Sequence, residues 1–119
     1  TQVVLSGRIS ELDRVTEVLA RRSIRGKRLP VAAAFHSPLV AAASARFRPL
    51  LDEVEFSLPD VPVFANSHAE EYPADADAAR SLLAGQLARP VEFTRQIENM
   101  YAAGVRTFVE VGPGAVLTG

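Results

Sequence analysis

The segment Leu29-Pro30-Val31-Ala32-Ala33-Ala34-Phe35-His36-Ser37-Pro38 contains the transition that decides the fold. Its first part, Leu29 to Phe35, is a short apolar run, which predicts a buried strand. Pro38 fixes its own backbone angle as a first helical residue does, and it favours an extended conformation at the residue before it. Ser37 is therefore predicted to cap a new helix. His36 lies between strand and helix, and its imidazole can exchange a proton near neutral pH.

Helical and strand patterns alternate along the rest of the chain. Four helices are expected: from Ser10 as N-cap to about Arg22, from Pro38 to about Leu51 with Pro49 disturbing the last turn, from Ala74 to Leu87 with Asp75 or Asp77 near its start, and from Pro90 to the residues before Gly104. The expected strands are Gln2 to Ser6, Leu29 to Phe35, Val61 to Ala65 and a buried strand from Thr107 to Val111. This alternation indicates an α/β layer architecture.

The composition limits the classes of protein that this chain can belong to. With 119 residues, 48% of them hydrophobic, it can form one small domain or part of one. The absence of cysteine excludes disulfides and thiolate metal sites and favours a cytoplasmic location. A net charge of −1 argues against general nucleic-acid binding, and no apolar stretch approaches the length of a membrane span.

Five segments that follow one another along the whole chain resemble the malonyl-CoA:carrier-protein acyltransferases, including the acyltransferase domains of polyketide synthases. They are Gln2-Val3-Val4-Leu5-Ser6-Gly7, Ala34-Phe35-His36-Ser37-Pro38, Pro62-Val63-Phe64-Ala65-Asn66-Ser67, Gln86-Leu87-Ala88-Arg89-Pro90-Val91-Glu92-Phe93 and Phe108-Val109-Glu110-Val111-Gly112-Pro113-Gly114. In that family the nucleophilic serine occupies an upstream G-x-S-x-G elbow, followed by an arginine that binds the substrate carboxylate, and this chain has no G-x-S-x-G. The resemblance therefore implies the C-terminal portion of such an enzyme.

The resemblance also implies a fold class and a division of the chain. Residues 34–119 would form the C-terminal part of an α/β-hydrolase-like acyltransferase core, and residues 1–33 the end of a ferredoxin-like small subdomain. From the pattern alone, the first strand, helix and second strand could equally form a right-handed crossover between parallel strands.

His36 and Gln86 are the predicted catalytic residues. A histidine at this position can be a core residue satisfied by a backbone carbonyl, or it can be a general base. The resemblance implies the second role, with the backbone carbonyl of Gln86 orienting the imidazole. On its own terms Gln86 falls on the inward stripe of its helix, where an amide needs a hydrogen bond, although a glutamine reaching solvent is the alternative.

Ala34 and Phe35 are predicted to contact the acyl group of the substrate. In polyketide acyltransferases a motif that ends at the catalytic histidine correlates with the extender unit: His-Ala-Phe-His with malonyl, and Tyr-Ala-Ser-His with methylmalonyl. This chain has Ala33-Ala34-Phe35-His36, which matches the malonyl form except at its first residue. Phe35 could fill the space that a branched acyl group needs.

Other residues that could carry chemistry are assigned structural roles. Ser37 adjoins the histidine, but adjacent side chains of an extended segment point in opposite directions, so it is a cap and the nucleophile lies outside this chain. His68 is expected to be an exposed loop histidine. Glu110 is expected to hold the turn at Gly112-Pro113-Gly114. No metal site is expected, because no H-x-H or H-x-x-x-H spacing occurs.

The predicted function is transfer of a malonyl group from CoA, through a serine ester, to the phosphopantetheine thiol of an acyl carrier protein. The expected partners are malonyl-CoA, the carrier protein and the remainder of the acyltransferase domain, within a polyketide or fatty-acid-type synthase; no bound cofactor is expected, since the CoA thioester is the substrate. The alternative is a non-catalytic docking module. It would use the cationic cluster, defined as Arg21, Arg22, Arg25, Lys27 and Arg28, to hold an acidic carrier protein or a neighbouring domain. The same cluster also suits a solvated helix C-terminus.

Overall fold

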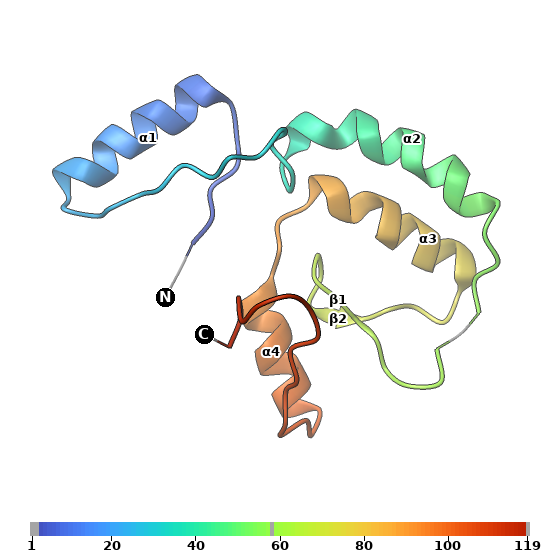
Figure 1. Cartoon of the computed structure of the whole chain (residues 1–119). Coiled ribbons are helices and arrows are strands. Elements are labelled where there is room, and N and C mark those ends of the chain that lie inside the picture. Colours follow the sequence, from blue (N-terminus) through green and yellow to red (C-terminus); the bar gives the residue numbers. More distant parts are fainter. Residues whose placement is uncertain (1–2, 58, 119) are drawn as a thin grey trace.

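The computed structural model describes residues 3–57 and 59–118. Four α-helices, two short 3₁₀ helices and one small antiparallel sheet follow one another along the chain (Figure 1). The α-helices are α1 (Ile9–Arg21), α2 (Ala41–Asp52), α3 (Ala76–Gly85) and α4 (Phe93–Ala102); the 3₁₀ helices are η1 (Pro38–Val40) and η2 (Gln86–Ala88); the strands are β1 (Phe64–Ala65) and β2 (Glu70–Glu71). No helix of the described residues is long and apolar enough to cross a membrane.

Arginine side chains join α2 and α3, which lie side by side (Figure 1). Arg80 of α3 donates from Nε to the carbonyl oxygen of Leu51 at 2.9 Å and from Nη2 to that of Val54 at 2.8 Å. These carbonyls belong to the end of α2 and the turn after it. Arg48, near the same end of α2, pairs with Asp77 in the first turn of α3. Arginine contacts thus join the C-terminal end of α2 to the N-terminal half of α3.

A short hairpin, formed by β1 and β2 between α2 and α3 in the sequence, packs against α4. Phe64 pairs with Glu71 in its register, and the carbonyl oxygen of Phe64 accepts a hydrogen bond from Gln96 Nε2 at 3.1 Å. Asn99 Nδ2 donates to the carbonyl oxygen of Ala69, at the hairpin turn, at 2.8 Å. Because both donors lie on α4, these two hydrogen bonds hold the hairpin against α4.

Three of the four predicted strands are not strands in the described residues. Strand pairing is absent from three predicted strands in the described residues: residues 3–6, Leu29–Phe35 and Thr107–Val111. Gln2 lies outside the described residues. Val109 and Val111 are 78% and 93% exposed, so the prediction of a buried strand is wrong. A strand needs a neighbour for its backbone N–H and C=O groups, and the described residues offer these segments none. Only Val61–Ala65 contains a strand, β1 over its last two residues.

Several helix boundaries differ from their predictions. Helix α1 begins earlier than predicted, with Arg8 rather than Ser10 at the N-cap, and it buries none of its side chains. Of the two acidic residues expected near the start of the third helix, Asp75 is the N-cap of α3 and accepts from the Ala78 N–H at 2.7 Å. The helix begins at Ala76 rather than Ala74 and ends at Gly85, which places Gln86 in η2. Helix α4 begins at Phe93 rather than at Pro90.

Pro49 and Gly104 lie near the ends of α2 and α4, where the sequence predicted an effect on each helix. Pro49 was expected to disturb the last turn of its helix, yet α2 continues to Asp52. That turn keeps a salt bridge of 2.7 Å between Arg48 and Asp52, which are four residues apart, and this pair supports the helix despite the lost backbone donor. Gly104 follows α4 with φ +104°, the left-handed conformation that ends a helix, as predicted.

Candidate active site

His36 occupies a strained backbone position between the extended segment and η1. Its φ is +61°, in the left-handed region that a residue with a Cβ adopts rarely and at a cost of about 1 to 3 kcal/mol. Its backbone N–H donates to the carbonyl oxygen of Leu87 at 2.8 Å, which holds the residue against η2. Strained residues of this kind cluster at functional sites, so the conformation marks His36 independently of its side chain.

The His36 ring is oriented by two backbone carbonyls. Nδ1 lies 3.2 Å from the carbonyl oxygen of Gln86 and 3.2 Å from that of Arg89. Carbonyl oxygens only accept hydrogen bonds, so in the neutral ring Nδ1 carries the proton and Nε2 carries the lone pair. Because His36 is exposed, that lone pair is accessible to a proton donor. The ring is thus oriented by backbone carbonyls rather than by a carboxylate, the arrangement that the predicted role of a general base requires.

The chain turn around η2 explains why these carbonyls point to one place. The Gln86 carbonyl accepts from the Arg89 N–H at 3.3 Å and, because a carbonyl oxygen has two lone pairs, can also accept from His36. Arg89 is extended, with φ −106° and ψ 148°, as expected for a residue that precedes a proline. Three carbonyls, those of Gln86, Leu87 and Arg89, therefore receive hydrogen bonds from the single residue His36.

Ser37 acts as the predicted cap. Its side chain is 5% exposed, its hydroxyl donates to the carbonyl oxygen of Ala34 at 2.7 Å, and its oxygen accepts from the Leu39 N–H at 3.4 Å. A buried hydroxyl engaged on both sides cannot reach a substrate. The structure thus confirms Ser37 as a cap, whereas the location of the nucleophile outside this chain stays a prediction.

The two predicted substrate contacts precede the histidine along the chain. Phe35 is 48% exposed and Ala34 is half-buried. The carbonyl oxygen of Phe35 accepts a hydrogen bond from Ser6 Oγ at 2.6 Å, which ties the first described segment to the His36 turn. Phe35 is therefore open to solvent, while its backbone carbonyl is held.

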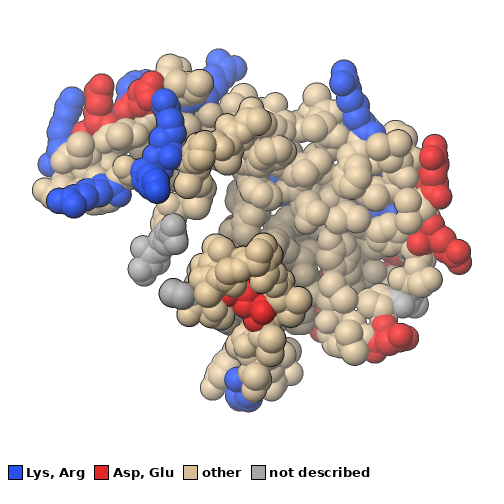
Figure 2. All heavy atoms as spheres, viewed as in Figure 1, with Lys and Arg blue, Asp and Glu red and all other residues tan. Residues whose placement is uncertain are grey.

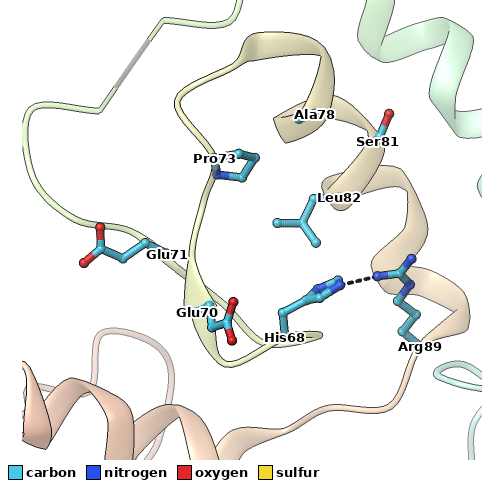
Figure 3. A pocket seen from close by; sticks show the side chains of 8 residues that line it. All are labelled: His68, Glu70, Glu71, Pro73, Ala78, Ser81, Leu82 and Arg89. Atoms are coloured by element: carbon cyan, nitrogen blue, oxygen red, sulfur yellow. Dashed lines mark hydrogen bonds between the residues drawn. The ribbon is translucent and has the colours of Figure 1, made fainter.

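His68 is not the exposed loop histidine that the sequence predicted. It is half-buried at the turn between β1 and β2, and its Nε2 faces the Arg89 guanidinium (Figure 3). Its Nδ1 lies 3.0 Å from Ser67 Oγ. The polar loop predicted an exposed histidine, but Arg89, the partner of His68, lies 21 residues further along the chain and could not be identified from the local sequence. The sequence likewise did not single out Arg89, although the Pro90 that follows it was a signal of an extended residue with a free carbonyl.

Glu110 holds the turn that follows it, as predicted. Its carboxylate accepts hydrogen bonds from the N–H groups of Val116, Leu117 and Thr118 at 2.9, 3.1 and 3.2 Å, and from Thr118 Oγ1 at 2.7 Å. The Thr118 hydroxyl, followed by these backbone groups, lowers the pKa of Glu110 below its usual value. Among residues 3–57 and 59–118, no group of three His, Cys, Asp or Glu side chains could hold a metal ion.

The cationic cluster is open to solvent around the end of α1. Lys and Arg side chains gather over this helix in the space-filling view (Figure 2). All five members are exposed, and Arg28 forms a salt bridge of 2.9 Å with Asp13. Its exposure is compatible with both interpretations of the cluster, the solvated helix end and the docking surface.

An exposed, carbonyl-oriented histidine on an α/β scaffold fits the class of acyltransferases that use a histidine base. No family model matches this chain. Over 99% of its length it is 36% identical to the malonyl CoA-acyl carrier protein transacylase of Bacillus subtilis and 36% identical to that of Escherichia coli K12, and it covers 37% and 38% of these proteins. It is 35% identical, over the same share, to a polyunsaturated fatty acid synthase polypeptide of a Thraustochytrium species, of which it covers 4%.

Solved structures give the same result. The chain aligns with the malonyl CoA-acyl carrier protein transacylases of Clostridium perfringens and Xanthomonas oryzae at TM-scores of 0.85 and 0.87 and identities of 32% and 30%. It aligns equally well, at a TM-score of 0.87 and 30% identity, with a malonyl-transacylase solved in complex with a type II polyketide synthase acyl-carrier protein. The alignments cover 92 to 94% of this chain and 34 to 36% of those proteins.

Both comparisons confirm the resemblance to the malonyl-CoA:carrier-protein acyltransferase family and the α/β fold class. The chain is similar to a portion of these transacylases and spans between a third and two fifths of their length. The division at residue 33 and the roles of His36, Gln86, Ala34 and Phe35 stay predictions.

Proposed function

We propose that this chain provides the general base of an acyltransferase that moves a malonyl group from CoA to an acyl carrier protein. The observation that carries the proposal is the position of His36 Nδ1, 3.2 Å from each of two carbonyl oxygens, which leaves Nε2 free and exposed. The family likeness supplies the substrate class, because the similar proteins are named malonyl CoA-acyl carrier protein transacylases.

In the first half-reaction, His36 Nε2 takes the proton from the hydroxyl of a serine that lies outside this chain. The serine oxygen attacks the malonyl thioester carbonyl, the carbon–sulfur bond breaks, and the CoA thiolate leaves with the proton that the imidazolium returns. While the ring is protonated, the carbonyls of Gln86 and Arg89 stabilise its positive charge from the Nδ1 side. They take the place that a carboxylate has in a serine-protease triad.

In the second half-reaction, Nε2 accepts the proton of the phosphopantetheine thiol of the carrier protein. The sulfur attacks the serine ester, the carbon–oxygen bond breaks, and the serine oxygen recovers its proton from His36. The same nitrogen thus acts as base and then acid in both half-reactions, which requires that its orientation is preserved throughout.

The identity of the acyl group depends on the residues before the base. We assign Phe35 and Ala34 to the acyl pocket, because both directly precede His36 in the sequence and Phe35 is 48% exposed. A bulky ring there favours the unbranched malonyl group over methylmalonyl. The parent protein would belong to a polyketide or fatty-acid-type synthase in the cytoplasm, consistent with a chain that has no cysteine.

A non-catalytic docking module is the second candidate function. The exposed cationic cluster at the end of α1 favours it, since five clustered cations would attract an acidic carrier protein. This function does not need the strained, carbonyl-oriented His36.

The test is the His36→Ala variant of the complete acyltransferase, assayed for single-turnover acylation by labelled malonyl-CoA. We expect acylation to slow by about a hundredfold or more, the scale of a lost general base. Arg28→Ala serves as the matched control and should keep the acylation rate. A folded His36→Ala enzyme with the wild-type rate would contradict the proposal, whereas loss of carrier binding in Arg28→Ala alone would favour the docking module.

A further inference from the structure

We propose that His68 is a positioning residue for His36 and that it acts through Arg89. The inference rests on the proposed function of His36 as the base. His68 comes from the turn of the β1–β2 hairpin and Arg89 from the segment after η2, and the two side chains point toward each other at the edge of a pocket (Figure 3). Arg89 also contributes one of the two carbonyls at His36 Nδ1. One residue therefore connects the two histidines of the chain.

The hydrogen-bond direction between His68 and Arg89 is fixed by chemistry. A guanidinium group only donates, so Nε2 of His68 must accept from Arg89 Nη1. The proton of the neutral ring then lies on Nδ1, which can donate to Ser67 Oγ at 3.0 Å. His68 therefore serves this link only in its neutral form.

The backbone on the far side of Arg89 is tied to the same hairpin. The Glu92 N–H donates to the carbonyl oxygen of Asn66 at 2.8 Å, two residues before His68. The segment from Arg89 to Glu92 is thus anchored to the hairpin at both ends, by a side chain at one end and by backbone at the other. Removing the His68 contact would leave the Arg89 end without its tie to the hairpin, so that the carbonyl facing His36 is positioned only by the bond of the Arg89 N–H to the Gln86 carbonyl at 3.3 Å.

Charged groups of both signs lie around His68. Glu70 and Glu71 of β2 line the same pocket as His68 and Arg89. Glu70 also lies 3.8 Å from Arg95 of α4. The lining side chains of α3, Ala78, Ser81 and Leu82, are uncharged. Protonation of His68 by acid would remove the acceptor and place two cations together, which releases Arg89.

The experiment compares His68→Ala, His68→Gln and Arg89→Ala in the complete acyltransferase, with Arg95→Ala as the control. Both kcat and KM for malonyl-CoA are measured across pH, and the His36 Nδ1–H signal is followed by nuclear magnetic resonance. We expect His68→Ala and Arg89→Ala to lower kcat by about three- to tenfold, the scale of one lost hydrogen bond, with KM unchanged. The glutamine amide oxygen can accept from Arg89, so His68→Gln should restore kcat and should lose the part of the acid fall in kcat that His68 causes.

Each outcome decides for or against the link. A weakened His36 Nδ1–H signal in His68→Ala that returns in His68→Gln supports it. Wild-type kcat and an unchanged signal in His68→Ala overturn it, as does a His68→Gln variant that behaves like the alanine variant. If His68→Ala does not fold, Arg89→Ala gives the same test, because it keeps the carbonyl and removes only the side chain. The signal is read without turnover, so failure of the base assignment, seen in His36→Ala, is distinguishable from failure of this link.

Discussion

Substitution of Ser37 by alanine tests whether this serine is a cap or a nucleophile. The change removes the acceptor of the Leu39 N–H and the donor to the Ala34 carbonyl at 2.7 Å. Loss of an N-cap costs about 1 kcal/mol, and loss of a second hydrogen bond at a half-buried carbonyl adds up to about 1 kcal/mol. We therefore expect the free energy of unfolding to fall by about 1 to 2 kcal/mol. Acylation by the folded enzyme should change only a few-fold, in line with a small disturbance of the adjoining His36.

The assay combines urea unfolding of the complete acyltransferase with single-turnover acylation, and Ser44→Ala is the matched control. Ser44 Oγ is buried in α2 and has no hydrogen-bond partner among the described residues. Removing an unpaired buried hydroxyl should leave stability unchanged or raise it. A loss of acylation of about a thousandfold or more in Ser37→Ala, with no loss of stability, is the result expected of a nucleophile and would refute the cap assignment.

Three further predictions concern other residues of the chain. Gln86→Ala should keep kcat within a few-fold because it keeps the carbonyl, whereas Gln86→Pro should lower kcat far more because it removes the N–H that bonds to the Leu82 carbonyl; equal kcat values for the two variants would contradict this. The pKa of Glu110 is lowered in the folded state, so its contribution to stability is complete above the unfolded pKa of about 4.3 and is lost as pH falls through the folded value. Amide exchange at Val116–Thr118 should therefore accelerate in acid. In Glu110→Gln this acid dependence should be absent. Phe35→Ser should relax the malonyl to methylmalonyl ratio of kcat/KM by about tenfold or more, in the range that one methyl group allows, and an unchanged ratio would exclude Phe35 from the acyl pocket.

Elements coded by neighbouring residues were predicted well from the sequence. The Ser37-Pro38 pair and the Gly104 stop act within one helical turn, and the structure has both. Of the two acids expected near the start of the third helix, the structure has Asp75 as the cap. The first helix was displaced only slightly at its start, because Arg8 takes the cap position without a side-chain hydrogen bond.

Strands could not be predicted equally well because their hydrogen bonds are made with distant residues. The apolar runs Leu29–Phe35 and Thr107–Val111 have strand-like composition, but pairing depends on a neighbour that composition does not specify. Exposed valines in these segments mark surfaces that lack a neighbour among the described residues.

The candidate site divides in the same way. The position of His36 between an apolar run and a capped helix made it a candidate, but its role as the base, like that of Gln86, was implied only by the family resemblance. The Arg89 carbonyl and the His68 contact bring together residues 53 and 21 positions apart, which no local pattern indicates.

The tautomer of His36 tests the central claim most directly. Nitrogen-15 spectra of the complete acyltransferase at neutral pH distinguish the protonated ring nitrogen from the unprotonated one. Two carbonyl oxygens at 3.2 Å from Nδ1 predict a neutral ring with the proton on Nδ1 and a free lone pair on Nε2. A neutral ring with its proton on Nε2 would show that the carbonyls do not orient His36 and would contradict its assignment as the base.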